Sequence, residues 1–335
     1  MRAYQLQAFG YQNLHRVDLP DPAPGPGEVL VRLRAVSLNY RDHLMVRGQY
    51  NPRQPLPLIP CSDGAGEVVA LGPRVTRFKL GERVMPIFAQ DWIAGRPTQE
   101  RVRSTLGGPR DGLLRELGVF SEHALVRIPA HLDYEQAATL PCAGLTAYNA
   151  LFKFEPLCAG QRVLVLGTGG VSIFALQFAK AAAAEVFVTS SDAAKLARAQ
   201  ALGADHLVNY KEVPEWGKEV RRLSGGEGVD IVVEVGGAGS LANSIRATTI
   251  GGLIVLLGVL AGDANPPNLT PVFMSGLRVQ GLMVGNRDDF EAMNRFISAH
   301  RLTPVIDRAF DFDQANEAFS HLVGQSHLGK VVIRV

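Results

Sequence analysis

The stretch VLVLGTGGVSIFALQFAK, residues 163–180, decides how this chain folds. An apolar run at 162–166 predicts a buried strand, and a helical pattern follows over about 171–184. Glycines permit a tight turn and a close approach of the backbone, and a helix N-terminus supplies free N–H groups with a partial positive charge. We therefore predict that this turn binds the pyrophosphate of a dinucleotide. The predicted contacts are Gly167, Thr168, Gly169, Gly170 and Val171.

The turn departs from the usual glycine pattern at one position. A third glycine would fall where Ser172 stands. A small residue still lets the helix pack closely on the strand, so the fit is imperfect but workable. The alternative is a tight turn in an α/β domain that binds no ligand.

Apolar runs alternate with helical patterns through the middle of the chain. This alternation is typical of a parallel sheet covered by helices on both faces, so we predict the α/β class with a doubly wound sheet. The predicted strands are 162–166, 185–189, 206–210, 229–235, 253–258 and 278–284, and the further helices are 192–203, 214–223 and about 240–248.

The two ends of the chain follow a different pattern. Residues 28–36 alternate apolar and polar side chains, and 64–72 and 83–88 also predict strands. Residues 89–118 are polar and rich in Gly, Arg and Pro, so we expect a long excursion, a candidate lid over a site. After about residue 287 the pattern predicts a helix, a strand, a helix and a terminal strand. This tail is expected to pair with the N-terminal β-rich part.

Composition excludes several classes of protein. The 335 residues carry 34 Lys and Arg against 32 Asp and Glu, a net charge of +2, which argues against a dedicated nucleic-acid binder. There is no apolar run of about 18 residues and no pattern of a secretory leader, so we expect a cytoplasmic protein without a membrane segment. Three cysteines do not make a disulfide framework.

The whole chain resembles the medium-chain dehydrogenases/reductases, in particular their zinc-independent, quinone oxidoreductase-like or zinc-free alcohol dehydrogenase-like branch. The stretches that carry the resemblance are PGPGEVLVRLRAVSLNYRDHLMVRGQY (24–50), PCSDGAGEVVALG (60–72), AATLPCAGLTAYNAL (137–151), GTGGVSIFALQFAK (167–180) and LGADHLVNY (202–210). The resemblance implies a discontinuous GroES-like catalytic domain, 1–129 with 287–335, and a Rossmann domain, 130–286, with the active site in the cleft between them. It also implies hydride transfer between NAD(P)(H) and a carbonyl compound, an alcohol or an activated double bond.

Zinc-containing members of the family place metal ligands at three positions of this chain. Those positions hold Asn39, the pair Ser62-Asp63, and Cys142. A neutral amide is a poor zinc ligand, and residues 90–116 lack the four cysteines of a structural zinc loop, so we expect no zinc. Without a Lewis acid, reduction of an enone or a quinone is favoured over alcohol oxidation, since conjugation delocalises the developing charge.

The end of the second predicted strand bears on the choice of cofactor. An NAD site usually carries a carboxylate there, but this chain has Ser190 and Ser191, followed by Lys195 and Arg198. Hydroxyls with nearby cations suit a 2′-phosphate, which favours NADPH over NADH. The alternative is that Ser191 or Asp192 caps the next helix and the cations are solvated.

Asn39 and Tyr40 are the candidate catalytic residues, since they resemble the family's zinc-free signature. Asn39 would hydrogen-bond the substrate oxygen or the nicotinamide ribose, and Tyr40 would donate a proton or orient the oxygen. The alternative is that Asn39 shapes a turn while Arg41 and Asp42 form a structural ion pair. Tyr50 is a candidate for the substrate pocket.

Further cofactor contacts are expected from the family pattern and from the rule that ligands bind at the carboxyl ends of parallel strands. Lys330 is expected to be no more than a surface residue of the terminal strand. The further cofactor candidates are Thr146, Tyr210, Val235, Gly236, Gly258, Val259, Leu260, Met283, Val284 and Gly285.

Two other functions stay open at this level. A zinc-independent alcohol dehydrogenase or a 2-enoyl thioester reductase would use the same scaffold, with arginines of the 89–118 excursion (Arg96, Arg101, Arg103 and Arg110) meeting a carrier's phosphate. A nucleotide-binding protein with a structural or RNA-binding role is the third candidate, which the charge does not support. The strand at 278–284 is expected to form a sheet edge that pairs with a second copy, giving a homodimer.

Overall fold

The structure, a computed structural model, describes residues 1–258, 260 and 267–335. By its contacts the chain divides into two compact units, Met1–Leu145 with Val284–Val335, and Thr146–Met283. The predicted domain boundaries, 129/130 and 286/287, stay predictions. No helix in the described part of the chain combines the length and apolar character that a bilayer crossing requires.

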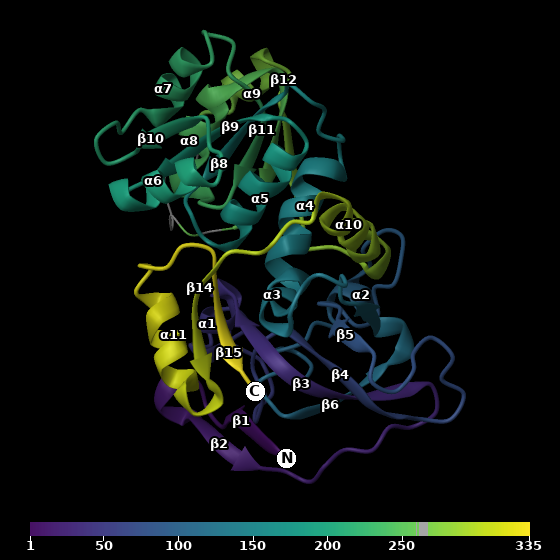
Figure 1. Cartoon of the computed structure of the whole chain (residues 1–335). Coiled ribbons are helices and arrows are strands. Elements are labelled where there is room, and N and C mark those ends of the chain that lie inside the picture. Colours follow the sequence, from purple (N-terminus) through teal and green to yellow (C-terminus); the bar gives the residue numbers. More distant parts are fainter. Residues whose placement is uncertain (259, 261–266) are drawn as a thin grey trace. The chain divides into compact units, whose positions relative to one another are not determined.

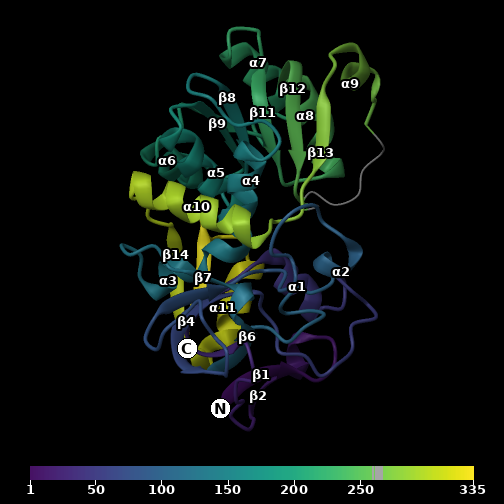
Figure 2. The ribbon, with the colours of Figure 1, turned by 90° about the vertical axis from the view of Figure 1, so that its right-hand side faces the viewer.

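The second unit is built on a six-stranded sheet whose strands are all parallel (Figures 1 and 2). Its strand order, β10-β9-β8-β11-β12-β13, is that of a doubly wound nucleotide-binding sheet, which confirms the predicted fold class. The strands are β8 (Arg162–Leu166), β9 (Glu185–Ser190), β10 (His206–Asn209), β11 (Val229–Glu234), β12 (Thr248–Leu256) and β13 (Arg278–Gly281). The helices are α4 (Leu145–Phe152), which begins in the first unit, α5 (Gly170–Ala181), α6 (Ala193–Ala201), α7 (Trp216–Leu223), α8 (Ala238–Ala247) and α9 (Thr270–Met274).

The central strands of this sheet are apolar on both faces because helices cover both of them. Leu164, Val232 and Ile254 come from three neighbouring strands and are fully buried, together with Phe187 of β9. Full burial of such a side chain contributes about 1.5–3 kcal/mol relative to exposure. The alternation of apolar runs in the sequence therefore predicted the type of sheet correctly.

The last two strands differ from their predicted bounds. β12 begins at Thr248, five residues before the predicted start, because Thr248 pairs with Val229 and a register shift separates that pair from the rest of the ladder. β13 ends at Gly281, three residues before the predicted end. All its side chains are exposed, and it forms the edge of the sheet, as predicted.

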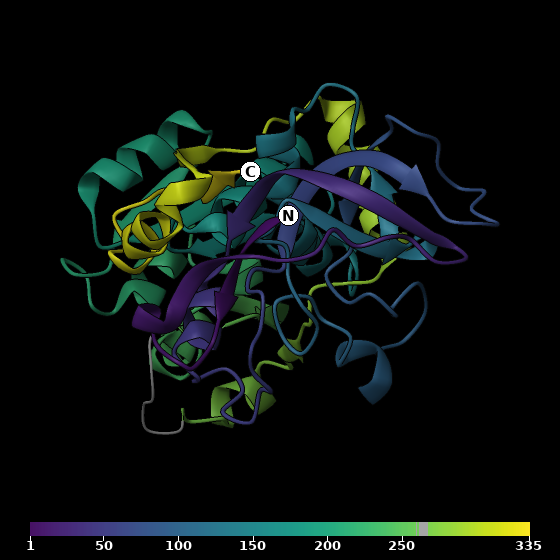
Figure 3. The ribbon, with the colours of Figure 1, turned by 90° about the horizontal axis from the view of Figure 1, so that it is seen from below.

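The first unit contains a seven-stranded sheet of order β14-β15-β3-β4-β5-β7, with β6 paired to β3, and the two-stranded sheet β1-β2 (purple in Figure 3). Its strands are β1 (Arg2–Leu6), β2 (Leu14–Asp18), β3 (Glu28–Leu38), β4 (Asp63–Leu71), β5 (Arg83–Pro86), β6 (Leu117–Ser121), β7 (Leu125–Arg127), β14 (Ile306–Asp311) and β15 (Lys330–Arg334). Its helices are α1 (Tyr40–Val46), α2 (Gln99–Val102), α3 (Tyr134–Ala138), α10 (Arg287–His300) and α11 (Ala315–Val323), with a π-helical turn η3 (Leu140–Gly144) and short 3-10 turns η1 (Tyr11–Asn13), η2 (Glu122–Ala124) and η4 (Phe312–Gln314).

The C-terminal segment belongs to this sheet. β15 pairs antiparallel with β3 and parallel with β14, so the β-rich part is discontinuous in sequence, as expected from the tail pattern.

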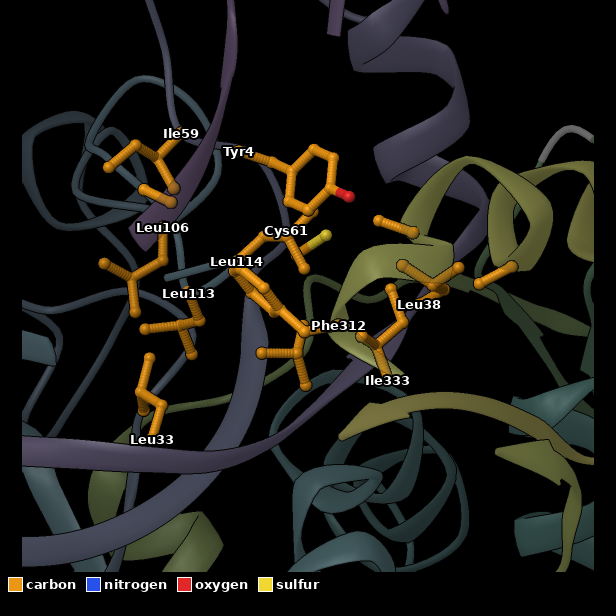
Figure 4. Packing of buried hydrophobic residues seen from close by; sticks show 14 of the residues in the cluster. Tyr4, Leu33, Leu38, Ile59, Cys61, Leu106, Leu113, Leu114, Phe312 and Ile333 are labelled. Atoms are coloured by element: carbon orange, nitrogen blue, oxygen red, sulfur yellow. The ribbon is translucent and has the colours of Figure 1, made fainter. Parts of the chain in front are cut away.

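One apolar core holds the first unit together, and it includes part of the polar excursion. Figure 4 shows Tyr4 and Phe312, from opposite ends of the chain, around the same cluster as Leu113 and Leu114. The rings of Tyr4 and Phe312 lie 5.2 Å apart, edge to face. Leu106 is buried in this core too. The 89–118 excursion is polar overall, but these buried apolar side chains anchor it in the core of the first unit.

Candidate functional site

The candidate catalytic residues lie where β3 passes into α1. Asn39 is the N-cap of α1, with extended backbone angles. Its N–H donates to Asp42 Oδ2 at 2.8 Å, and the Asp42 N–H donates back to the Asn39 carbonyl at 2.9 Å. This reciprocal pair satisfies donors at the start of the helix and fixes the Asn39 backbone. Asn39 thus shapes the turn, and its side chain still has other partners.

Lys330 supplies one of those partners, and its position corrects the expectation of a surface residue. Its side chain is only 3% exposed, and its Nζ donates to Asn39 Oδ1 and to the Leu38 carbonyl, both at 2.6 Å. The cause is strand register. β15 runs antiparallel to β3 with Val331 opposite Leu38, which places the preceding residue beside the end of β3.

The remaining positions that resemble zinc-ligand positions also come together. Asn39 Nδ2 lies 3.5 Å from Ser62 Oγ, and Ser62 Oγ donates to Asp63 Oδ1 at 2.8 Å. The other carboxylate oxygen of Asp63 accepts from the Cys142 N–H at 3.0 Å. Cys142 lies in the π-helical turn η3, a rare element that is frequent at functional sites. Four segments distant in sequence therefore form one buried polar cluster, the Asn39 cluster: Asn39, Ser62, Asp63, Cys142 and Lys330.

Charge in the Asn39 cluster is governed by burial and by one cation. Burial raises the pKa of Asp63, and the Lys330 ammonium is the main opposing influence. Burial likewise lowers the pKa of Lys330, and Asp63 opposes this most strongly. Burial also raises the pKa of the Cys142 thiol, which keeps it protonated. The ammonium and the Asp63 carboxylate thus support each other's charged forms.

These donors do not fit a zinc ion. The Asn39 oxygen already accepts from an ammonium, which would repel a divalent cation, and a neutral amide is a poor zinc ligand. Within the described ranges no group of three or more His, Cys, Asp or Glu side chains is arranged to hold a metal.

Arg41 connects α1 to the excursion. Its guanidinium donates to the carbonyls of Leu106 and Gly108, at 2.8 and 3.1 Å, and lies 3.6 Å from Asp42. The ion pair considered from the sequence is therefore present, and both side chains are buried. The guanidinium also lies 4.9 Å from the ring centre of Tyr50, which is half exposed. A role of Tyr50 in a substrate pocket stays a prediction.

The other candidate, Tyr40, is the first residue of α1 and is 36% exposed. Its ring centre lies 5.5 Å from that of His43, whose Nδ1 is 2.7 Å from the hydroxyl of Tyr11. Within the part of the chain that the structure describes, the Tyr40 hydroxyl has no hydrogen bond that would assign it a role, so its part in proton transfer stays a prediction.

The excursion carries its own surface hollow of about 530 Å³. Two of its charged side chains, Arg110 and Asp91, form an ion pair at 2.5 Å, and Arg101 donates to the carbonyl of Arg96. The wall is therefore mixed in charge and is not a uniformly basic mouth. The residues that line it are Asp91, Gln99, Glu100, Arg103, Ser104 and Arg110.

In the second unit the glycine-rich turn has the geometry that a pyrophosphate requires. Gly167 has a φ of +71°, a conformation that favours glycine, and its N–H donates to the Thr189 carbonyl at 2.8 Å. A Cβ at Gly167 or Gly169 would meet no atom within 4 Å, so open space lies beside the backbone. Helix α5 begins at Gly170 without a side-chain cap, which leaves its first N–H groups for a ligand. The turn thus fits a dinucleotide.

Ser172 explains how the turn works without its third glycine. Its hydroxyl donates to the carbonyl of Leu166 at 2.7 Å, which ties α5 to the end of β8. Its neighbour Val171 lies in the first turn of α5, and Thr168 is buried within the link.

The ends of β9 and β10 lie side by side. Tyr210 donates its N–H to the Ser190 carbonyl at 3.1 Å, and its side chain is exposed. Ser190 is buried, and its hydroxyl accepts from the Asp192 N–H at 3.3 Å. Asp192 caps α6 by accepting from the Lys195 N–H at 3.1 Å, so this carboxylate, not Ser191, is the cap that the sequence left open.

The turn after β11 is organised by a carboxylate that the sequence analysis missed. Glu234 is fully buried and accepts from the N–H groups of Gly236 and Gly237 at 2.7 and 3.0 Å, and from the hydroxyls of Ser240 and Ser244. The Gly236 N–H is therefore engaged within the chain. A glutamate that ends an apolar strand just before two glycines was the available signal.

The other predicted cofactor contacts lie in varied surroundings. Gly258 packs so closely on the Val235 backbone that a Cβ would lie 2.5 Å from its carbonyl oxygen. Thr146 and Gly285 are buried, Leu260 and Met283 are exposed, and Val284 packs in part against the small cluster of Phe88, Ala89 and Trp92. Val259 lies outside the described residues. Their contacts with a cofactor stay predictions.

Known proteins match both halves of this arrangement. The family model of the alcohol dehydrogenase GroES-like domain matches residues 25–130, and that of the zinc-binding dehydrogenases matches residues 170–299. A zinc-type alcohol dehydrogenase-like protein from Schizosaccharomyces pombe is 44% identical over 316 residues, covering 92% of this chain and 91% of the relative. A quinone oxidoreductase from Lama guanicoe is 27% identical over 99% of this chain and 97% of its own.

Solved structures agree with these relatives. A structure from Sinorhizobium meliloti 1021 assigned to the alcohol dehydrogenases has a TM-score of 0.94 and 41% identity, and covers all of this chain and 98% of its own. An NAD-dependent alcohol dehydrogenase has a TM-score of 0.91 and 35% identity, with both chains covered in full. A mycobacterial protein complexed with NADPH has a TM-score of 0.83 and 25% identity, again over both whole chains. The chain therefore belongs to the medium-chain dehydrogenase/reductase superfamily and is an oxidoreductase.

Proposed function

We propose that this oxidoreductase uses NADPH to reduce a quinone, an enone or a related activated carbonyl compound, and that it does so without zinc. The observation that supports this proposal is the Asn39 cluster. A buried ammonium occupies the polar centre of the positions that correspond to zinc ligands, and it donates to Asn39 Oδ1 at 2.6 Å. The family activity is hydride transfer, and these residues favour substrates that need no Lewis acid.

The chemistry of a conjugated substrate suits this donor set. When bound, the nicotinamide supplies the hydride, and addition at the β-carbon of an enone moves negative charge onto the carbonyl oxygen. One or two neutral hydrogen-bond donors suffice to stabilise such an enolate. Asn39 Nδ2 is placed to offer such a donor, because its contact with Ser62 Oγ, at 3.5 Å, is long, and its side chain also donates toward the Asp63 carboxylate.

The preference for NADPH is supported by the end of β9. Ser190 and Ser191 stand where an NAD site usually has a carboxylate, and Lys195 lies in the first turn of the helix that follows, α6. Asp192 is occupied in capping α6. The related structures include both an NAD-dependent enzyme and an NADPH complex, so they do not favour either cofactor. The preference for NADPH therefore rests on the residues at the end of β9.

The test combines metal analysis with turnover. We expect the purified protein, freed of metal with a chelator, to oxidise NADPH with a quinone or an enone at an unchanged rate. The panel of test substrates contains, besides the quinone and the enone, an aldehyde, an alcohol with NADP⁺, and a 2-enoyl thioester. Loss of activity that zinc restores would contradict the zinc-free proposal. Turnover of the alcohol or the thioester alone would assign one of the two alternative functions.

We also propose that the protein is a homodimer. The edge strand β13 exposes its whole length, and large apolar side chains are exposed in β13, in its neighbour β12 and in and next to α9. Unpaired edges with exposed apolar residues are usually covered by another chain. The exposed side chains in question are Ile250, Leu269, Phe273, Met274 and Val279.

A further inference from the structure

Lys330 is an unusual residue to find in a protein interior. Its ammonium is buried, and its two hydrogen-bond partners, the Leu38 carbonyl and Asn39 Oδ1, are both neutral. Among the described residues no carboxylate lies within 4.0 Å of it, although Asp63 is near enough to oppose the effect of burial on its pKa. A buried cation without a close counter-charge costs free energy, so its retention calls for a reason other than stability.

The ammonium determines which way the Asn39 amide faces. A lysine ammonium carries three donors and no acceptor, so only the amide oxygen can face it. The amide nitrogen must then face the other way, toward Ser62 Oγ. With a neutral neighbour that both donates and accepts, the two orientations of the amide would compete.

The same direction continues through the cluster. Lys330 donates to Asn39, Asn39 Nδ2 faces Ser62 Oγ, and the Ser62 hydroxyl donates to Asp63. The second oxygen of Asp63 accepts from the Cys142 N–H. The three side-chain donors, Lys330, Asn39 and Ser62, thus point from the ammonium toward the carboxylate, and hydrogen bonds in such a series polarise one another.

We propose that Lys330 is a positioning residue for hydride transfer, which holds the Asn39 amide with its nitrogen as the donor and polarises that donor toward the substrate oxygen. This inference rests on the proposed reductase function. The positive charge acts through Asn39 and does not touch the substrate. Its effect is greatest when negative charge develops on the substrate oxygen, so it lowers the barrier for hydride transfer more than it strengthens substrate binding.

The test is a double-mutant cycle with Lys330→Met and Asn39→Leu. Methionine keeps much of the apolar stem and removes the donors, and leucine removes the amide at similar volume. We expect each single variant to lower kcat at least tenfold with the Kd for NADPH unchanged. The double variant should be no slower than Asn39→Leu alone, because Lys330 acts through that amide. If kcat of the double variant falls by the product of the two single losses, the two residues act independently, and the proposal is overturned. Lys79→Met is the surface control.

A second readout does not depend on activity. In the wild type the side-chain amide of Asn39 gives an NMR signal whose ¹⁵N and ¹H shifts report the bond to the ammonium. We expect Lys330→Met to move this signal, and an unmoved signal would overturn the proposal. If Lys330→Met does not fold, Lys330→Gln takes its place, because its amide can face Asn39 either way. If the wild type turns over no substrate of the panel, the proposed function fails, and the NMR signal alone decides the orientation of Asn39.

Discussion

The ammonium of Lys330 lies 2.6 Å from the side-chain oxygen of Asn39, although 291 residues separate the two in sequence. The register between β15 and β3 creates this contact, since both residues stand at the same end of one strand pair. A cation held at this point gives the site positive charge of its own. The proposal of a zinc-free reaction rests on this relationship more than on any single motif.

Asp42 should make the protein less stable as pH rises from about 4 to 6. Burial raises its pKa from 3.8 to about 6, with the Arg41 guanidinium opposing and Asp63 adding to the rise. The native state therefore binds this proton more tightly than the unfolded chain, so the free energy of unfolding falls across this range, by about 3 kcal/mol in total. Asp42→Asn should remove this component, measured as the difference between the two unfolding curves at each pH.

Glu122 offers a control of opposite sign. Burial works to raise its pKa, but the N–H groups of Arg77 and Thr76 outweigh burial and hold the pKa below its usual value. Its contribution to stability is present above the unfolded pKa and is lost as pH falls. Glu122→Gln should therefore change the pH profile in the opposite direction. Equal profiles for Asp42→Asn and the wild type would contradict the role of Asp42.

Gly169→Ala should weaken cofactor binding without weakening the fold. Gly169 has a φ of −73°, which alanine adopts readily, and a Cβ there would meet no atom within 4 Å. The added methyl would occupy the space in which a pyrophosphate approaches the backbone. We expect Tm to stay within a degree or two and the Kd for NADPH, measured by fluorescence, to rise roughly tenfold or more. An unchanged Kd would place the pyrophosphate elsewhere.

Ser191→Asp should change the cofactor preference from NADPH toward NADH. A carboxylate at the end of β9 accepts hydrogen bonds from a ribose 2′-hydroxyl and repels a 2′-phosphate. The ratio of kcat/KM for the two cofactors should move by roughly tenfold or more, since one charged hydrogen bond is gained and one charge repulsion is added. Lys195→Met should weaken NADPH alone. A wild type that already prefers NADH would refute the assignment of these residues.

Phe273→Lys should convert the proposed dimer to a monomer. Phe273 is 81% exposed in α9, beside Met274, which is 72% exposed. A charge buried in an apolar interface without a partner costs several kcal/mol, whereas the same charge in water costs nothing comparable. Light scattering during gel filtration gives the mass. Leu80→Lys, at a 65% exposed position of the first unit, is the matched control and should leave the mass unchanged.

The elements that local pattern controls could be predicted well. The strands of the second unit's sheet are apolar runs, because both faces of a parallel sheet are covered, and their alternation with helices along the chain indicates the doubly wound fold. The bounds of β12 and β13 were wrong because a register shift and an exposed edge decided them. The polar composition of residues 89–118 predicted a long excursion and a candidate lid, and it gave no sign that Leu106, Leu113 and Leu114 anchor this segment in the core.

The sequence by itself determined the superfamily, the class of fold and the dinucleotide turn, since these depend on residues that are neighbours in the chain. Only the tertiary structure decided the character of the Asn39 cluster. A lysine that opens an apolar terminal strand carries no local sign of burial, and its partner Asn39 lies 291 residues away in sequence. Strand register and the packing of distant segments decide which charges are buried together, and short-range pattern does not encode them.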